Sequence, residues 1–229
     1  MPALSDGVYI AIREQILRGR LRPGAPLARR QLAEQLGTTV AGVSEALRRL
    51  EDERLVESRG RAGARVRVYT DEDVRGLYEL REALETQAAR LFSQRATPAQ
   101  RLELRRLAEQ IDVLFSRLAG NAEDQEFRFT VHRYHVQFHL WIAEHARSPL
   151  LRQLIERHHV LILNWLFDLS GRRTPLPAKF HGRLAEALVS KDVAQADAAM
   201  RAHVRYGLTE VSGAISLAAK ESRSRKPRD

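Results

Sequence analysis

Apolar residues recur every three or four positions along most of the chain, which is the spacing that places them on one face of an α-helix. The first predicted helix ends near residue 18 and carries four such residues: Leu4, Val8, Ile12 and Ile16. Two prolines and a glycine within residues 21–26 exclude a helix there and predict a turn.

Two short helices follow, separated by a turn of three or four residues. The first is predicted from about Arg29 to Leu36, with Gly37 as its C-cap. The hydroxyl of Thr38 or Thr39 can cap the next helix by accepting free N–H groups of its first turn. That helix directs four apolar residues inward: Val43, Ala46, Leu47 and Leu50. Two helices joined in this way are typical of the helix-turn-helix arrangement.

Between residues 57 and 69 the pattern changes to the period of two that is typical of a β-strand. Val66 and Val68 alternate with Arg65 and Arg67, and two preceding glycines supply turn positions. This segment is predicted to form a β-hairpin wing.

From Asp71 onward the periodicity is helical, and its interruptions predict about six helices packed as a bundle. The expected fold class is therefore mainly α. A winged helix-turn-helix domain (1–70) is followed by an all-α helical bundle (71–218) and a short basic tail (219–229) that is predicted to be disordered.

The charge is distributed unevenly over these three parts. The whole chain has a formal net charge of +9, and residues 1–70 hold thirteen arginines and no lysine against eight acidic residues. The tail holds five basic and two acidic residues. Head and tail together therefore account for nearly all of the net charge, and the body is close to neutral. A basic head suggests a polyanionic partner.

Double-stranded DNA is the partner that this head favours. The start of a helix in the major groove contacts base edges, while nearby arginines neutralise phosphates. The candidate DNA contacts are Thr38, Thr39, Ser44, Arg48, Arg49, Arg59, Arg61, Arg65 and Arg67. Taken singly, each arginine is explained as well by an ordinary solvated surface. The combination of helix-turn-helix, wing and arginine bias favours DNA binding.

The chain has no cysteine, which excludes disulfides, thiolate metal sites and cysteine nucleophiles and fits a reducing compartment. It also shows no signal-peptide pattern and no apolar run of about 20 residues. We therefore expect a cytoplasmic protein with no membrane partner.

Four histidines have a spacing that suits a metal ion. His135 and His139 lie four residues apart and so share a helix face, while His181 and His203 lie on two later helices that packing can turn inward. Imidazole favours Zn²⁺, Ni²⁺, Cu²⁺ or Fe²⁺ over Mg²⁺ or Ca²⁺. On spacing alone, histidines without a metal remain the commoner explanation. The alternatives for His132, one turn before His135, are a substitute ligand and a surface residue, and the surface is favoured.

The head resembles the winged helix of GntR-type transcription regulators over residues 7–69. The resemblance rests on Leu-Ala-Glu-Gln-Leu-Gly at 32–37, Val-Ser-Glu-Ala-Leu-Arg-Arg-Leu-Glu at 43–51 and the Gly/Arg wing. Family members usually carry Ser-Arg-Thr-Pro-Val-Arg-Glu-Ala-Leu, and the positions of its two arginines are Val40 and Ser44 here. Guanine recognition by those arginines is therefore excluded. Either the operator differs from the common family sites, or specificity comes from wing contacts, from Thr38, Thr39 and Ser44, and from DNA shape.

The body resembles the FCD domain of the FadR class of GntR regulators. His135-Val-Gln-Phe-His139 is similar to the Asp-x-x-Phe-His pattern, and the segments around His181 and His203 and the helix at 77–85 are similar too. In that family an Asp and three His hold a metal, and the matching positions here are these four histidines, with His135 in place of the Asp. The resemblance implies a transition metal such as Zn, Ni or Fe.

The same resemblance implies a small carboxylate effector in the bundle. Arg81 and Asn164 are the candidate effector contacts, and the alternatives are an Arg81–Glu85 salt bridge at i+4 and an exposed Asn164. The predicted count of six helices favours the shorter, VanR-like variant of this domain.

These features together predict a homodimeric repressor or activator that binds a roughly palindromic operator and responds to its effector by a population shift. The rival interpretation is a metallo-enzyme, because a histidine cluster can activate water. The chain has no H-E-x-x-H, nucleophile motif or phosphate-binding glycine loop, and an enzyme would leave the basic head unexplained. We therefore expect no enzymatic activity.

Overall fold

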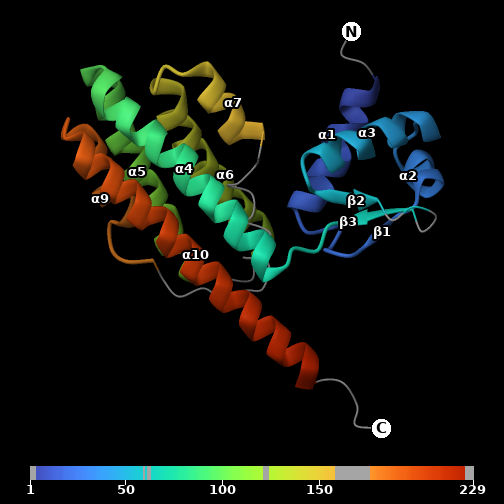
Figure 1. Cartoon of the computed structure of the whole chain (residues 1–229). Coiled ribbons are helices and arrows are strands. Elements are labelled where there is room, and N and C mark those ends of the chain that lie inside the picture. The colour runs from blue at the N-terminus through green and yellow to red at the C-terminus, as the bar shows by residue number, and fades with distance from the viewer. Residues whose placement is uncertain (1–3, 59, 61–62, 121–123, 158–175, 225–229) are drawn as a thin grey trace. The chain divides into compact units, whose positions relative to one another are not determined.

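The computed structural model describes residues 4–58, 60, 63–120, 124–157 and 176–224 (Figure 1). The chain divides into two compact units, Met1–Tyr69 and Thr70–Asp229. No helix among the described residues is long and apolar enough to cross a membrane.

Among its described residues, the first unit contains three α-helices and a small antiparallel sheet. The helices are α1 (Leu4–Leu17), α2 (Arg29–Gln35) and α3 (Val40–Asp52). The strands are β1 (Pro26–Leu27), β2 (Val56–Ser58) and β3 (Ala64–Val66), in the order β1-β3-β2. A helix-turn-helix is thus followed by a hairpin, the arrangement of a winged helix.

The core of this unit lies between α1 and α3. The predicted apolar faces are buried there: Val8, Ile12, Ile16, Val43, Ala46, Leu47 and Leu50. Gly37 has a φ of 60°, which suits a residue without a side chain just after α2. Thr39 is the N-cap of α3, and its hydroxyl oxygen accepts the N–H of Gly42.

Two details of the sheet differ from the predicted pattern. The third strand ends at Val66, and Val68 is 48% exposed, so the expected alternation through Val68 is wrong. Strand β1 was not predicted, because its two residues take their strand geometry from pairing with the distant Ala64 and Arg65. Pro26 is tolerated because β1 is an edge strand.

The second unit is entirely helical in its described residues. Its six helices are α4 (Asp71–Arg95), α5 (Pro98–Gly120), α6 (Gln125–His145), α7 (Pro149–Arg157), α9 (Phe180–Val189) and α10 (Val193–Ser224). Helix α10 packs beside α4, while α5 packs against α6 and α9 (Figure 1). The inner faces of α4, α6, α9 and α10 position the histidines described below.

The end of the chain corrects one prediction. Residues 219–229 were expected to be a disordered tail, yet α10 continues to Ser224, while residues 225–229 lie outside the described residues. The segment contains alanine, lysine, glutamate and arginine, which favour helix, and its first proline is Pro227. The lack of apolar residues was therefore a poor guide to its backbone conformation.

Buried Arg101 fixes three helix ends to one another. Its guanidinium donates to the carbonyls of Ser93 and Ala96 at the end of α4 and of Val189 at the end of α9, at 2.6, 3.1 and 3.1 Å. Carbonyls in the last turn of a helix have no partner within the helix. Arg101 satisfies them and holds α4, α5 and α9 in a fixed arrangement.

Candidate metal centre and candidate DNA interface

Three buried histidines converge inside the second unit. His139 Nε2 lies 3.0 Å from His135 Nε2 on the same helix and 3.2 Å from His203 Nε2 on α10. Helix α6 directs His135 and His139 inward together with Phe138, which is fully buried. One ligand nitrogen from each of the three histidines lies within 4.8 Å of the others, close enough for a single metal ion.

His181, in the first turn of α9, stands beside this triad. Its ring centroid is 4.9 Å from that of His135 and 5.4 Å from that of His203. Its Nε2 is buried and has no hydrogen-bond partner among the described residues. The structure therefore groups three of the four predicted ligands and places the fourth next to them.

Asp112 on α5 holds the other side of the His181 ring. Its Oδ1 lies 2.8 Å from His181 Nδ1, and the carboxylate also accepts the backbone N–H groups of His181 and Gly182. Burial would raise the pKa of Asp112, but the hydrogen bonds from His181 and Gly182 lower it below its usual value. A charged Asp112 thus caps α9 and fixes the ring orientation of His181.

Glu85 plays the corresponding part for His139. Its Oε2 lies 2.5 Å from His139 Nδ1, and its Oε1 accepts the Nε–H of Arg81 at 2.5 Å. Burial alone would raise the pKa of Glu85, but Arg81 and His139 lower it to about 2. Sequence reasoning considered Glu85 only as a partner of Arg81, and that pair is present, with Arg81 only 1% exposed.

The donor set fits a transition metal. Histidine ligands commonly have their second ring nitrogen held by a carboxylate, which fixes the tautomer and leaves the first nitrogen to bind the ion. Glu85 and Asp112 do this for His139 and His181. Burial, and then the neighbouring histidines, lower the pKa of His135 and His203 well below the usual value. These rings are therefore neutral, the form that binds metals.

One further sequence prediction can be placed and another cannot. His132 is 3% exposed and meets Phe115 edge to face, so its assignment to the surface was wrong. It lies three residues before His135 and so shares the inward face of α6. Asn164 lies outside the described residues.

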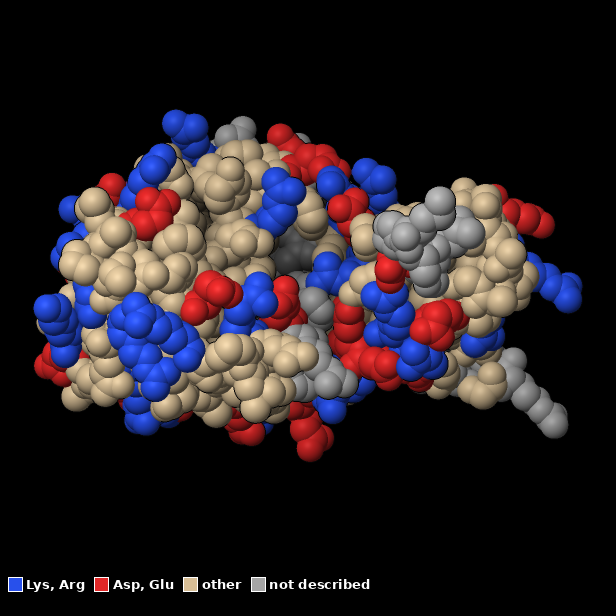
Figure 2. Space-filling view, turned by 90° about the horizontal axis from the view of Figure 1, so that it is seen from above, with Lys and Arg blue, Asp and Glu red and all other residues tan. Residues whose placement is uncertain are grey.

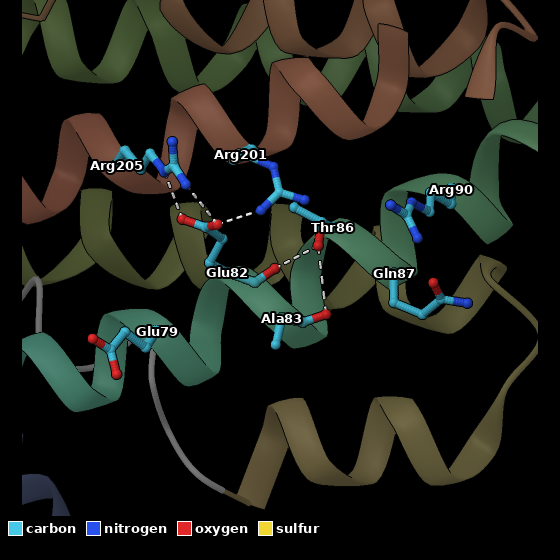
Figure 3. Close-up of a pocket in the computed structure, with 8 residues that line it drawn as sticks. All are labelled: Glu79, Glu82, Ala83, Thr86, Gln87, Arg90, Arg201 and Arg205. Carbon is cyan, nitrogen blue, oxygen red and sulfur yellow. Dashed lines mark hydrogen bonds and ion pairs between the residues drawn. The ribbon is translucent and has the colours of Figure 1, made fainter. Parts of the chain in front are cut away.

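A pocket of about 370 Å³ lies between α4 and α10 (Figure 3). Glu82 binds both Arg201 and Arg205 there, with Arg205 Nε 2.8 Å from its carboxylate. Arg90 is 2.7 Å from Asp197. None of the clustered histidines lines this pocket. Each of the three arginines that line the pocket is paired with an acid, Glu82 or Asp197.

The predicted DNA-contacting end of α3 is largely apolar. Thr39 uses its hydroxyl oxygen to cap the helix, and Ser44 Oγ donates to the carbonyl of Val40 at 2.8 Å. Val40 itself is 44% exposed.

The described candidate arginines of this unit are engaged within the protein. Arg48 lies between Glu45 (2.7 Å) and Asp52 (3.2 Å). Arg49 pairs with Asp6 at 2.6 Å and lies over the ring of Tyr9.

In the hairpin, Arg65 pairs with Glu57, and the guanidinium of Arg67 lies 5.3 Å from the ring centre of Tyr69. Arg59 and Arg61 lie outside the described residues. On the face drawn in Figure 2, basic and acidic side chains are interspersed. Phosphate contacts by Arg48 or Arg65 would therefore exchange an internal ion pair for an external one.

Comparison with known proteins gives matches over both units. Residues 4–66 match the family model for bacterial regulatory proteins of the gntR family, and residues 76–206 match the FCD domain. The regulator LutR of Bacillus subtilis is 28% identical over 227 residues, covering 88% of this chain and 96% of LutR. The regulator McbR of Escherichia coli is 31% identical over 163 residues, covering 69% of each chain.

Solved structures give the same fold. The structure of E. coli McbR/YncC covers 92% of this chain and 98% of its own, with a TM-score of 0.72 and 23% identity. These relatives are transcription regulators, which decides against the metallo-enzyme interpretation. The chain belongs to the GntR family of bacterial regulatory proteins, in the FadR-like subfamily that carries an FCD domain.

Proposed function

We propose that this chain is a dimeric transcription regulator that binds a roughly palindromic operator and senses a small carboxylate through a metal centre in its helical bundle. The sensing part of this proposal rests on the convergence of His135, His139 and His203. The Nε2 atoms of His135 and His203 lie 3.0 and 3.2 Å from that of His139. Each neutral imidazole offers one unprotonated nitrogen, and a single cation can bind one such nitrogen from each of the three rings.

In this proposal each winged helix enters a major groove. The start of α3 faces the bases with Thr38, Thr39 and Ser44, and the arginines bind phosphates. The phosphate contacts are assigned to Arg48, Arg49, Arg59, Arg61 and Arg65. Two-fold symmetry of the protein would match two-fold symmetry of the DNA.

The triad and His181 would hold the ion, which when bound would supply Lewis-acid chemistry towards a carboxylate oxygen. One guanidinium nitrogen of Arg81 lies 3.4 Å from His139 Nε2, beside that position. Arg81 is thus placed to bind the second oxygen of the same carboxylate, and Asn164 remains a proposed contact. Preferential binding of the effector to one arrangement of the heads would shift operator affinity.

Elemental analysis of the purified, tag-free protein tests the metal centre. We expect Zn, Ni or Fe at close to one atom per chain, and we expect the His139→Ala variant to lose it. The matched control is His145→Ala on the same helix, because His145 Nδ1 lies 2.9 Å from the Trp141 carbonyl and is not part of the triad. Metal absent after anaerobic reconstitution, or lost equally in both variants, would overturn the centre and leave the DNA-binding assignment intact.

A further inference from the structure

The first residue of the recognition helix presents an apolar surface where a DNA-binding helix usually presents hydrogen-bonding groups. Val40 opens α3 and is 44% exposed, and the next residue, Ala41, is exposed as well. Because Val40 is 44% exposed, part of its side chain is available to a partner.

The hydroxyl groups around Val40 are partly used by their own helix. Thr39 accepts the N–H of Gly42, and Ser44 donates its hydroxyl proton to the Val40 carbonyl. Ser44 therefore keeps only its acceptor sites for a base. Val40 and Ala41 add an exposed apolar surface to the hydroxyl groups at this helix end.

The charged residues farther along α3 leave base recognition to its N-terminal end. Arg48 is held by Glu45 and Asp52, so a bond from Arg48 to guanine would have to displace two ion pairs. Glu45 accepts from Arg48 at 2.7 and 3.0 Å, which occupies the oxygens that would otherwise accept from a cytosine amino group.

The base feature that matches an apolar side chain in the major groove is the C5-methyl group of thymine. We infer that Val40, supported by Ala41, contacts a thymine methyl group in each operator half-site and is a specificity-determining residue. This inference rests on the proposed DNA binding, because the N-terminal residues of a recognition helix are those that meet base edges.

Deoxyuridine substitution tests the inference, since it removes only the methyl group from a thymine. An operator is first selected from a random duplex library with the full chain, and each thymine of one half-site is then replaced in turn. At one position we expect affinity, measured by fluorescence anisotropy, to fall about fourfold, the factor expected for burial of one methyl-sized group.

The protein variants decide which residue is responsible. In Val40→Ala the deoxyuridine effect at that position should largely disappear, while overall binding persists because the proposed phosphate contacts are unchanged. Val68→Ala is the matched control, since Val68 is also exposed (48%) but lies outside α3, and it should keep the full effect.

Three results would overturn the inference. They are the absence of any deoxyuridine effect, an unchanged effect in Val40→Ala, and a selected half-site without thymine. Any of these three results would contradict the thymine contact but not DNA binding itself. A selection that enriches no sequence would overturn both this inference and the proposed operator binding.

Discussion

Replacement of Glu85 by leucine is expected to lower the free energy of unfolding of the Thr70–Asp229 unit by about 3–5 kcal/mol, the cost of leaving one member of a buried ion pair uncompensated. Glu85 is 3% exposed and binds both Arg81 and His139. Its loss would strand a guanidinium that is 1% exposed. Urea denaturation followed by tryptophan fluorescence reports this unit alone, because both tryptophans of the chain lie in it.

Two variants test whether burial is the cause. Glu82→Leu removes an acid that also binds two arginines, Arg201 and Arg205, but at the surface, so a loss of at most about 1 kcal/mol is expected. The double variant Arg81→Leu/Glu85→Leu should recover part of the stability because no charge remains stranded. Equal losses in Glu85→Leu and Glu82→Leu would contradict this account of the pair.

Acid should remove the same stabilisation. The pKa of Glu85 is lowered from 4.5 to about 2 in the folded chain. The contribution of the pair is therefore complete above pH 4.5 and is lost as the pH falls toward 2, since the unfolded chain takes up the proton first.

Removal of the metal with a chelator is expected to lower the melting temperature of the second unit by on the order of 10 °C. A ligand present at a thousand times its dissociation constant stabilises a fold by about 4 kcal/mol, and each kcal/mol corresponds to about 2–4 °C for a protein of this size. The cause is that the proposed ion would bind only where His135, His139 and His203 are held together by the fold.

The comparison for this prediction is His139→Ala, in which the chelator should change the melting temperature little. Differential scanning fluorimetry of both proteins, with and without the chelator, gives the answer. The same downward shift in both would mean that the chelator acts elsewhere than on the triad.

The helix-turn-helix was predictable because its signals are local. Apolar spacing located α1 and α3, Gly37 ended the second helix and Thr39 began the third. Strand β1 was not predictable in this way, since its two residues form a strand only through pairing with residues 64–65. The extension of α10 to Ser224 was missed because composition was weighed above helix propensity.

The metal centre was predictable only in part. The i, i+4 spacing of His135 and His139 is visible in the sequence. The arrival of His203 depends on how α10 packs in the bundle, so spacing only allowed it and the family resemblance made it an expectation. Asp112 carried no local signal, because it meets His181 from 69 residues away. The partner of each ring is set by tertiary structure.

The measurement that tests the account most directly is the selection of DNA from a random duplex library by the full chain, followed by the stoichiometry of the selected complex. The account predicts an enriched inverted repeat bound by two chains per duplex. A library that yields no enriched sequence, or a single half-site bound by one chain, would contradict a dimeric regulator that recognises a palindromic operator.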